Sequence, residues 1–391
     1  MDTLAGMEHL PADWRDAALL GRLLTPRGPS PILVLRGRVY DISAIWPTTA
    51  DFVSAGAALD GLRGLEDLGP IEDLRLEPAW RAPEAAVRLL SPLDLQCVKA
   101  AGVTFAVSTL ERVIEERARG DSARAEALRG ALGERIGAEV GAVRPGTAQA
   151  AALKEALIAE GLWSQYLEVA IGPDAEVFTK APCLSTVGWG DFVGVRSDSH
   201  WNNPEPEIVL VCGRDGQPRG AALGNDVNLR DFEGRSALLL GKAKDNNASC
   251  AVGPFIRLFD EGFTLDDVRQ ATIHLEVVGE DNFRLEGTSS MARISRDPLE
   301  LVGQTIGKHH QYPDGFALFL GTMFAPIEDR GVPGQGFTHK PGDTVRVSNP
   351  RLGVLENRVT TCDQAPAWIF GVGDLMRNLA GRGLLGAAAH G

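Results

Sequence analysis

Two glutamates separated by a single residue, Glu205 and Glu207, form the pattern in this 391-residue sequence that is best suited to chemistry. Side chains two positions apart on an extended chain point to the same face, and Pro206 between them favours an extended backbone. Neighbouring carboxylates repel each other, so the pair must either raise a pKa or bind a cation. Asp226, in a turn after the next predicted strand, is the third candidate ligand. Such oxygen donors suit Mg²⁺, Mn²⁺ or Ca²⁺ better than zinc, although the spacing alone fits solvated charges on an edge strand equally well.

A lysine-containing segment supplies the next candidate group. Lys242 and Lys244 follow the apolar run 237–240, which we interpret as a buried strand. A lysine at the end of such a strand and near a divalent cation can be held partly neutral and serve as a base. Taken without their neighbours, both lysines are more typical of ordinary loop charges.

Together these residues resemble the fumarylacetoacetate hydrolase family. The pieces that carry the resemblance occur in order along the chain: Pro204-Glu205-Pro206-Glu207, Gly224-Asn225-Asp226, Lys244 ahead of Gly253-Pro254, Gly321-Thr322, and the late runs 340–345 and 353–359. The resemblance covers about residues 95–380. It implies an α+β fold with a mixed β-roll or barrel-like catalytic domain, in which Glu205, Glu207 and Asp226 hold Mg²⁺, or alternatively Mn²⁺ or Ca²⁺, beside Lys244.

Within this family, the stretches 175–182 and 196–201 are most similar to the sugar-acid dehydratases, which act on 2-keto-3-deoxy-pentonates. The resemblance therefore implies a magnesium-dependent hydro-lyase of pentose catabolism that converts a 2-dehydro-3-deoxy-D-xylonate or arabinonate to 2,5-dioxopentanoate. Lys244 is the expected base, because it lies near the metal, and the resemblance places Glu176 as the acid or water-handling group. The residues expected to position the substrate are Thr322, Ser197, Asp198 and Lys180.

Other activities remain open on the same scaffold. They are hydrolysis of a C–C bond in an acylpyruvate, isomerisation or decarboxylation of a 2-oxo diacid, and binding of a metal or keto acid without turnover. The family's C–C hydrolases have a His–Glu pair near the first strand of the catalytic domain, whereas the segment 102–111 contains no histidine. That difference disfavours hydrolysis. Asn247 also stands where the family's phrase usually has Asp, so its role is open.

The elements expected to position these residues are mainly short strands, as in a rolled α+β domain. We predict a small N-terminal domain over residues 1–95, with strands at 32–35 and 38–41, and a catalytic domain over 96–391. Helical patterns cover 110–140, with a break at Gly120, and 147–160, with Gly161 as a stop; another helix begins at Asp297. The predicted strands of the catalytic domain are 166–171, 176–180, 207–212, 237–240, 272–278, 316–320, 344–347 and 354–359.

Composition excludes several classes of protein. The net charge is −13 with no basic run, which argues against a nucleic-acid partner. No stretch reaches ~18 consecutive apolar residues, and the first residues lack the apolar core of a signal peptide, so we expect no membrane partner. Five scattered cysteines without CxxC spacing argue against a disulfide framework and for a cytoplasmic location. The family resemblance implies a small-molecule 2-keto acid as partner and a homodimer or homotetramer.

Overall fold

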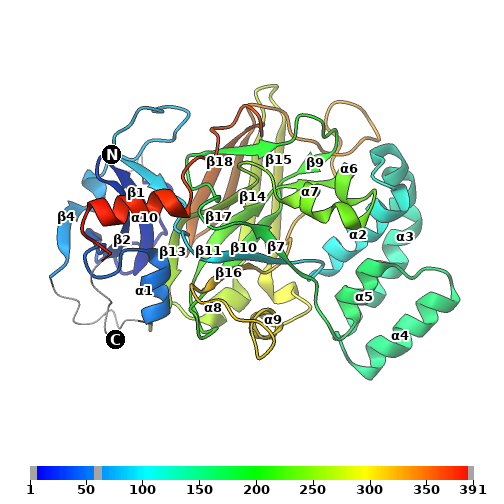
Figure 1. Ribbon diagram of the computed structural model, residues 1–391. Helices are drawn as coiled ribbons and strands as arrows, with labels where there is room; N and C mark the ends of the chain where they lie inside the picture. The colour runs from blue at the N-terminus through cyan, green and yellow to red at the C-terminus, as the bar shows by residue number, and fades with distance from the viewer. Residues whose placement is uncertain (1–6, 57–63, 386–391) are drawn as a thin grey trace.

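The computed structural model describes residues 7–56 and 64–385, and the side chains of all of these except 130–138. A strand-rich N-terminal part, two central sheets and a group of helices lie side by side (Figure 1). The large sheet runs in the order β4-β3-β2-β1-β13-β11-β10-β16-β6-β7, with β5 paired to β1. Its strands are β1 Leu19–Thr25, β2 Gly28–Leu35, β3 Arg38–Asp41, β4 Glu66–Pro70, β5 Arg88–Leu90, β6 Cys97–Ala101, β7 Val177–Ala181, β10 Pro206–Cys212, β11 Pro218–Asp226, β13 Cys250–Leu258 and β16 Phe316–Phe319.

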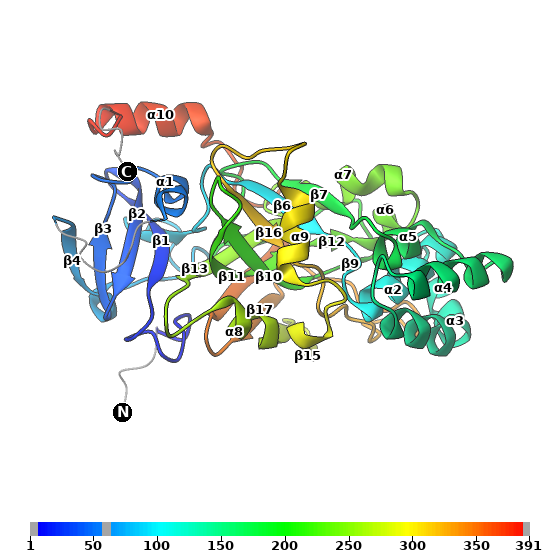
Figure 2. The same ribbon diagram turned by 90° about the horizontal axis from the view of Figure 1, so that it is seen from below.

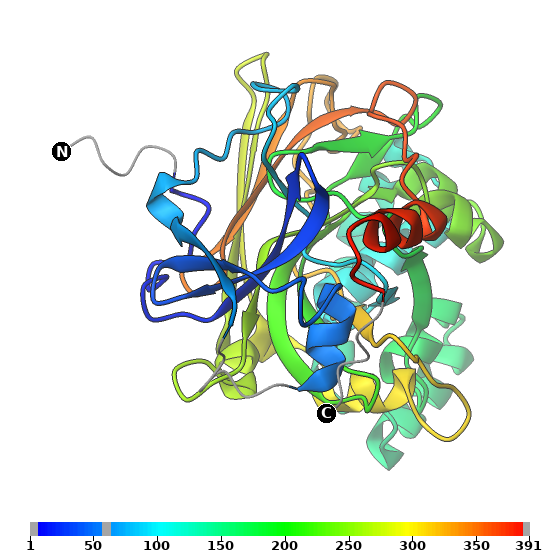
Figure 3. The same ribbon diagram turned by 60° about the vertical axis from the view of Figure 1, so that its left-hand side comes forward.

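A second sheet stands against the large one, and its hairpin and C-terminal strands come into view in Figure 3. Its order is β15-β14-β17-β18-β8, and a further small pair joins β9 to β12. The bounds are β8 Phe192–Val195, β9 Asn202–Asn203, β12 Asn228–Leu229, β14 Thr272–Val278, β15 Arg284–Ser290, β17 Thr344–Asn349 and β18 Gly353–Thr361. Both sheets are mixed, because β6–β16 and β8–β18 are parallel pairs among antiparallel ones.

Ten α-helices are assigned within the described residues. They are α1 Thr49–Ala55, α2 Ala106–Ala118, α3 Ser122–Ala142, α4 Ala148–Ala159, α5 Gln165–Ile171, α6 Arg230–Glu233, α7 Leu240–Lys244, α8 Leu265–Gln270, α9 Pro298–Thr305 and α10 Val372–Gly381. Helices α2 to α5 form a lobe at one end of the molecule, and α10 lies beside the N-terminal strands at the other (Figure 2). No helix in this described part of the chain is both long and apolar enough to cross a membrane.

Strand β10 shows how the core determines where the site lies. All seven of its residues are buried, and alternate side chains enter different apolar clusters. Ile208 and Leu210 face the second sheet, whereas Val209 and Val211 face away from it. Because side chains alternate along a strand, Glu207 projects to the same side as Val209. The candidate ligands therefore lie on the face of the large sheet that the second sheet does not cover.

The α+β class with mixed sheets is confirmed, but the barrel-like form is not. Along the described residues, the strand order of the large sheet ends at β4 and β7, and these two edges do not pair to close a barrel. The N-terminal strands are continuous with this sheet, since Leu19 and Leu20 pair with Arg257 and Ile256. A small domain over residues 1–95 is therefore not confirmed, and its boundary stays a prediction.

Several predicted elements are confirmed. The helical pattern over 110–140 is α2 and α3, and the break at Gly120 is found between them. Helix α4 is followed by Gly161 in a left-handed conformation, as expected of a stop. The carboxylate of Asp297 accepts a hydrogen bond from the Leu299 amide at 2.9 Å and caps α9.

Two predicted strands are wrong. The segment 166–171 belongs to helix α5. Ser164 caps the start of this helix, because its side chain accepts a hydrogen bond from the Tyr166 amide. Its buried residues pack into the helical lobe, so the apolar run follows a helical and not a strand period. The segment 237–240 is a short 3₁₀ turn leading into α7, and Leu238 is 95% exposed. Short apolar runs do not by themselves distinguish a buried strand from a helix.

Candidate metal centre

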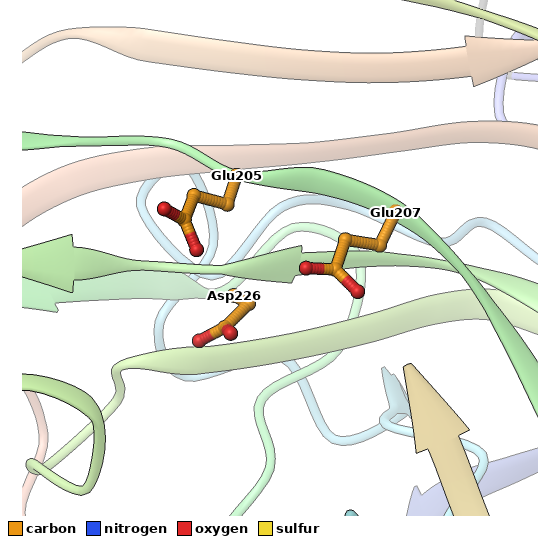
Figure 4. Close-up of side chains that lie close together, drawn as sticks. All are labelled: Glu205, Glu207 and Asp226. Carbon is orange, nitrogen blue, oxygen red and sulfur yellow. The ribbon is translucent and has the colours of Figure 1, made fainter. Parts of the chain in front are cut away.

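The structure brings together the three carboxylates that the sequence singled out. Glu205 and Glu207 come from the start of β10, and Asp226 ends β11, which pairs with β10 through Pro206–Asn225 and Glu207–Gly224. One oxygen from each carboxylate lies within 4.8 Å of the others, and all three side chains point toward one another (Figure 4). Each residue is at most 2% exposed, so the charges are not dispersed by water.

Glu207 is oriented by donors from the loop after β16. The Gly321 amide donates to its Oε2 at 2.7 Å, and the Thr322 hydroxyl lies 3.3 Å from its Oε1. Position 321 needs glycine, because its φ is +110° and an added Cβ would lie 1.9 Å from the Thr104 hydroxyl. Thr322, expected to position the substrate, thus lies at the site and contacts a candidate metal ligand.

Two buried lysines approach the same carboxylates. Lys244 Nζ lies 2.5 Å from Glu205 Oε2 and 2.9 Å from Asp226 Oδ2. Lys180 Nζ lies 2.8 Å from Asp226 Oδ1 and also donates to the backbone carbonyls of Val227 and Lys244. Lys180 does not line the cavity that contains the carboxylates, so its observed contacts position Asp226 and the backbone of Lys244.

The carboxylates around Lys244 stabilise its charged form, and the partly neutral lysine expected beside a cation stays a prediction. Burial disfavours a charge on Lys244, but the carboxylates of Asp226 and Glu205 outweigh burial and raise the pKa of the ammonium. Burial alone would likewise raise the pKa of Glu205, yet Lys244 and Arg112 lower it to about 2. With these neighbours the two groups form a charged pair.

The charge of the cluster favours a divalent cation. Burial, together with Asp226 and Glu205, raises the pKa of Glu207 well above its ordinary value. Among the described residues, six carboxylates face four basic side chains in this buried cluster: Glu115, Glu176, Glu205, Glu207, Asp226 and Glu233 against Arg112, Lys180, Arg230 and Lys244. A hard divalent ion beside Glu205, Glu207 and Asp226 would stabilise the ionised forms of all three, and carboxylate oxygens are donors that Mg²⁺, Mn²⁺ and Ca²⁺ accept. The residues present therefore fit such an ion.

Glu176, just before β7, lines the same cavity as the three carboxylates. The cavity is lined by Ala101, Gly102, Val103, Ser108, Arg112, Glu176, Phe178, Glu205, Glu207, Asp226, Glu233, Lys244 and Thr322. Burial first, and then the charge of Glu233, raise the pKa of Glu176 to about 7. A carboxyl with that pKa can give or take a proton near neutral pH.

Ser197 and Asp198 are not brought to this cavity. Both are exposed on the segment between β8 and β9, and the Asp198 carboxylate accepts two hydrogen bonds of 2.8 Å from Arg196. Asn247 also lies elsewhere, where its side chain donates to the carbonyls of Cys362 and Pro366. The substrate-positioning role of Ser197 and Asp198 stays a prediction.

Arg112 is one of the site residues that sequence reasoning missed, as are Ser108 and Glu233. It lies on α2 and donates to Glu205 Oε1 at 2.6 Å across 93 positions of sequence. In the sequence it is one charged residue among several in an amphipathic helix, and nothing in the helix period distinguishes it from a solvated arginine. Only the placement of α2 beside the chain that enters β10 brings this arginine to the carboxylates.

Fold and site together define an α+β protein with mixed sheets and a buried candidate site for a divalent cation, flanked by a lysine and a carboxyl that titrates near neutral pH. Residues 169–360 match the family model described as Fumarylacetoacetate (FAA) hydrolase C-terminal. These residues thus resemble the C-terminal domain of the family that the motifs predicted.

Curated relatives lie among the sugar-acid dehydratases. A stretch of 196 residues, 50% of this chain, is 31% identical to a Haloferax volcanii protein named "Probable 2-keto-3-deoxyxylonate dehydratase" and covers 64% of it. A stretch of 180 residues, 46% of this chain, is 32% identical to "2-dehydro-3-deoxy-D-arabinonate dehydratase" of Saccharolobus solfataricus and covers 57% of it. The matches thus span less than two thirds of the length of these relatives.

Solved structures share the fold over most of the chain. The apo form of a 2-keto-3-deoxy-D-arabinonate dehydratase covers 88% of this chain and 99% of its own, with a TM-score of 0.62 and 21% identity. A dehydratase complexed with magnesium and 2,5-dioxopentanoate gives a TM-score of 0.61 at 20% identity over the same shares. At such identities these likenesses show the fold alone.

Proposed function

We propose that this protein is a metal-dependent hydro-lyase that removes water from a 2-keto-3-deoxy-pentonate and yields 2,5-dioxopentanoate. The observation that carries the proposal is the buried cluster of Glu205, Glu207 and Asp226 with the Lys244 ammonium 2.5 and 2.9 Å from two of them. The names of the curated relatives support the same substrate class.

The three carboxylates would hold the ion, for which Mg²⁺ is our first choice. When bound, Mg²⁺ supplies a Lewis acid that polarises the keto oxygen of the substrate and balances the charge of the three carboxylates. Gly321 and Thr322 donate hydrogen bonds to Glu207 and would thereby orient this ligand. Lys180 does the same for Asp226 from the opposite side.

Lys244 is the proposed base for the proton at C3 of the substrate. Its position between Glu205 and Asp226 puts the amine at the edge of the candidate metal site and inside the cavity. When the carboxylates share their charge with a second cation, they stabilise the ammonium less, and deprotonated lysine becomes accessible. Its removal should therefore lower turnover and not only binding.

Glu176 is the proposed acid for the hydroxyl that leaves C4. Its pKa of about 7 keeps much of the carboxyl protonated at neutral pH, and it lines the same cavity as the carboxylates. The hydroxyl takes the proton of Glu176 and leaves as water, the C3 proton goes to Lys244, and a C3–C4 double bond forms. A proton shift from C5 then gives an enol that becomes the aldehyde of 2,5-dioxopentanoate.

The cavity does not favour the competing C–C hydrolase. Among the described residues that line it, none is a histidine, and α2 presents Ser108 and Arg112 there instead. Activation of water by a His–Glu pair therefore has no candidate in this wall of the site.

A product assay tests the proposal. The protein is incubated with Mg²⁺ and a panel of 2-keto-3-deoxy acids, acylpyruvates and 2-oxo diacids, and products are followed by mass spectrometry. We expect loss of one water from a deoxy-ketopentonate, inhibition by a chelator and recovery with Mg²⁺. Pyruvate from an acylpyruvate, or no turnover across the panel with full metal occupancy, would overturn the proposal.

A further inference from the structure

Arg112 holds one candidate metal ligand to two helices. Its Nη2 donates to Glu205 Oε1 at 2.6 Å, while its Nη1 lies 2.6 Å from Glu115 Oε2 and 2.9 Å from Glu233 Oε2. Glu115 lies on α2 with Arg112, and Glu233 ends α6. A single guanidinium thus connects α2, α6 and the chain entering β10.

The network continues away from the cavity. Arg230, at the start of α6, lies 3.2 Å from Glu115 Oε1 through its Nε, and its Nη1 donates to the carbonyl of Pro326 at 3.1 Å. Glu115 therefore lies between Arg112 and Arg230, and both terminal nitrogens of Arg112 contact carboxylates. Every member is buried: the exposed fraction is 9% for Arg112 and lower for Glu115, Arg230 and Glu233.

Stability alone does not explain so many buried charges. Removing ions from water costs several kcal/mol each, so buried ion pairs often contribute little net stability. What such a network does provide is a fixed geometry, since the planar guanidinium binds several carboxylates in defined directions. Here the geometry that it fixes is that of Glu205.

The contact also selects which oxygen of Glu205 faces the other ligands. Oε1 is taken by Arg112, whereas Oε2 is the oxygen next to Lys244, whose amine also contacts Asp226. Oε2 is thus the oxygen of Glu205 that Arg112 leaves available for an ion.

We infer that Arg112 is a positioning residue for the metal: by binding Glu205 Oε1 from α2, it presents Oε2 to the ion and couples cation affinity to the α2–α6 contact. The inference rests on the proposed metal site. It predicts that the shape of the side chain matters as well as its charge, because a lysine at 112 keeps the positive charge but lacks the planar guanidinium that binds carboxylates in fixed directions.

The test measures Mn²⁺ affinity by electron paramagnetic resonance of free Mn²⁺, without any substrate. Wild type is compared with Arg112→Lys, Arg112→Gln and Glu115→Gln, and melting temperatures are recorded for the metal-free proteins. The matched controls are Arg330→Lys and Arg330→Gln, because Arg330 is an equally buried arginine that binds Asp343 and Asp281 and has no contact with the three carboxylates.

We expect both Arg112 variants to bind Mn²⁺ ~10–100-fold more weakly, which is the usual cost of losing a partner that orients a ligand. Glu115→Gln should also weaken Mn²⁺ binding, but by a smaller factor, and the Arg330 variants should lose stability but keep their Mn²⁺ affinity.

If Arg112→Lys kept wild-type affinity and Arg112→Gln bound Mn²⁺ more tightly, Arg112 would act through charge alone and the inference would be overturned. The inference would also fail if the Glu115→Gln protein folded and every variant bound Mn²⁺ with wild-type affinity. If wild type itself bound no Mn²⁺, the proposed metal site would fail with it.

Discussion

Two places in this molecule bring carboxylates from neighbouring strands together, with opposite consequences. At the β10–β11 hairpin, Glu205, Glu207 and Asp226 are buried. At the β14–β15 hairpin, Glu276 and Glu286 are direct cross-strand partners, but Arg284 lies 2.6 and 2.8 Å from them at the surface.

At the surface, Arg284 offsets the repulsion between Glu276 and Glu286. The side chain of Glu286 is 66% exposed and that of Arg284 is 62% exposed, so water and one arginine suffice, and such pairs contribute little to stability. The buried cluster is shielded from bulk solvent, and its carboxyl groups outnumber the basic side chains around them. Proximity of carboxylates is therefore not enough to indicate a metal site; burial without full compensation is what distinguishes the β10–β11 cluster.

The largest expected effect is loss of turnover on removing the buried amine. Lys244→Ala should lower kcat by ~10²–10⁴-fold, the usual contribution of a general base. Lys242→Ala is the matched control, because Lys242 lies on the same helix but is exposed and should keep full activity. Steady-state kinetics with the deoxy-ketopentonate provide the measurement. Equal turnover in the two variants would remove Lys244 from its proposed role.

Metal affinity should separate the two carboxylate clusters. Glu207→Gln removes a ligand and should weaken Mn²⁺ binding by at least the ~10–100-fold that loss of an orienting partner costs. Glu276→Gln, in the surface cluster, should leave binding unchanged. Isothermal titration with Mn²⁺ measures both. Equal weakening by the two substitutions would mean that burial does not define the site.

Gly102 offers a smaller change directed at Glu176. A Cβ at position 102 would lie 2.0 Å from Glu176 Oε2, the flexible end of that side chain, and the φ of Gly102 lies outside the left-handed region. Gly102→Ala should therefore displace the carboxyl and lower kcat by up to ~10²-fold, with little change in KM. In a Glu176→Ala background it should have no further effect on kcat, and an additive loss in that double variant would argue against the contact.

The smallest effect concerns pH. Because Glu176 must be protonated to act as the acid and its pKa is about 7, kcat should fall as pH rises above 7, and Glu176→Gln should abolish that dependence. Stability follows the same sign: a carboxyl whose folded pKa is raised loses stabilisation as pH rises from its unfolded value through about 7. Wild type should therefore lose unfolding free energy relative to Glu176→Gln over that window in urea titrations at several pH values. A flat difference would show that Glu176 titrates normally.

What the sequence predicted well was local. The Glu205–Pro206–Glu207 spacing and the position of Asp226 after one hairpin are fixed by strand alternation and hairpin register, and both survive in the fold. The strands at 166–171 and 237–240 were wrong because short apolar runs suit either period. Arg112 was missed for a different reason: its contact with Glu205 depends on how α2 packs, and no local pattern encodes that contact.

The central claim is that the buried carboxylates of β10 and β11 bind a divalent ion. Crystals soaked in Mn²⁺ and measured at a wavelength that gives anomalous scattering test it most directly. We predict an anomalous peak coordinated by oxygens of Glu205, Glu207 and Asp226, with none at the Glu276–Glu286 pair. A fully soaked crystal without a peak at the buried cluster, or with its peak at the surface pair, would contradict the claim.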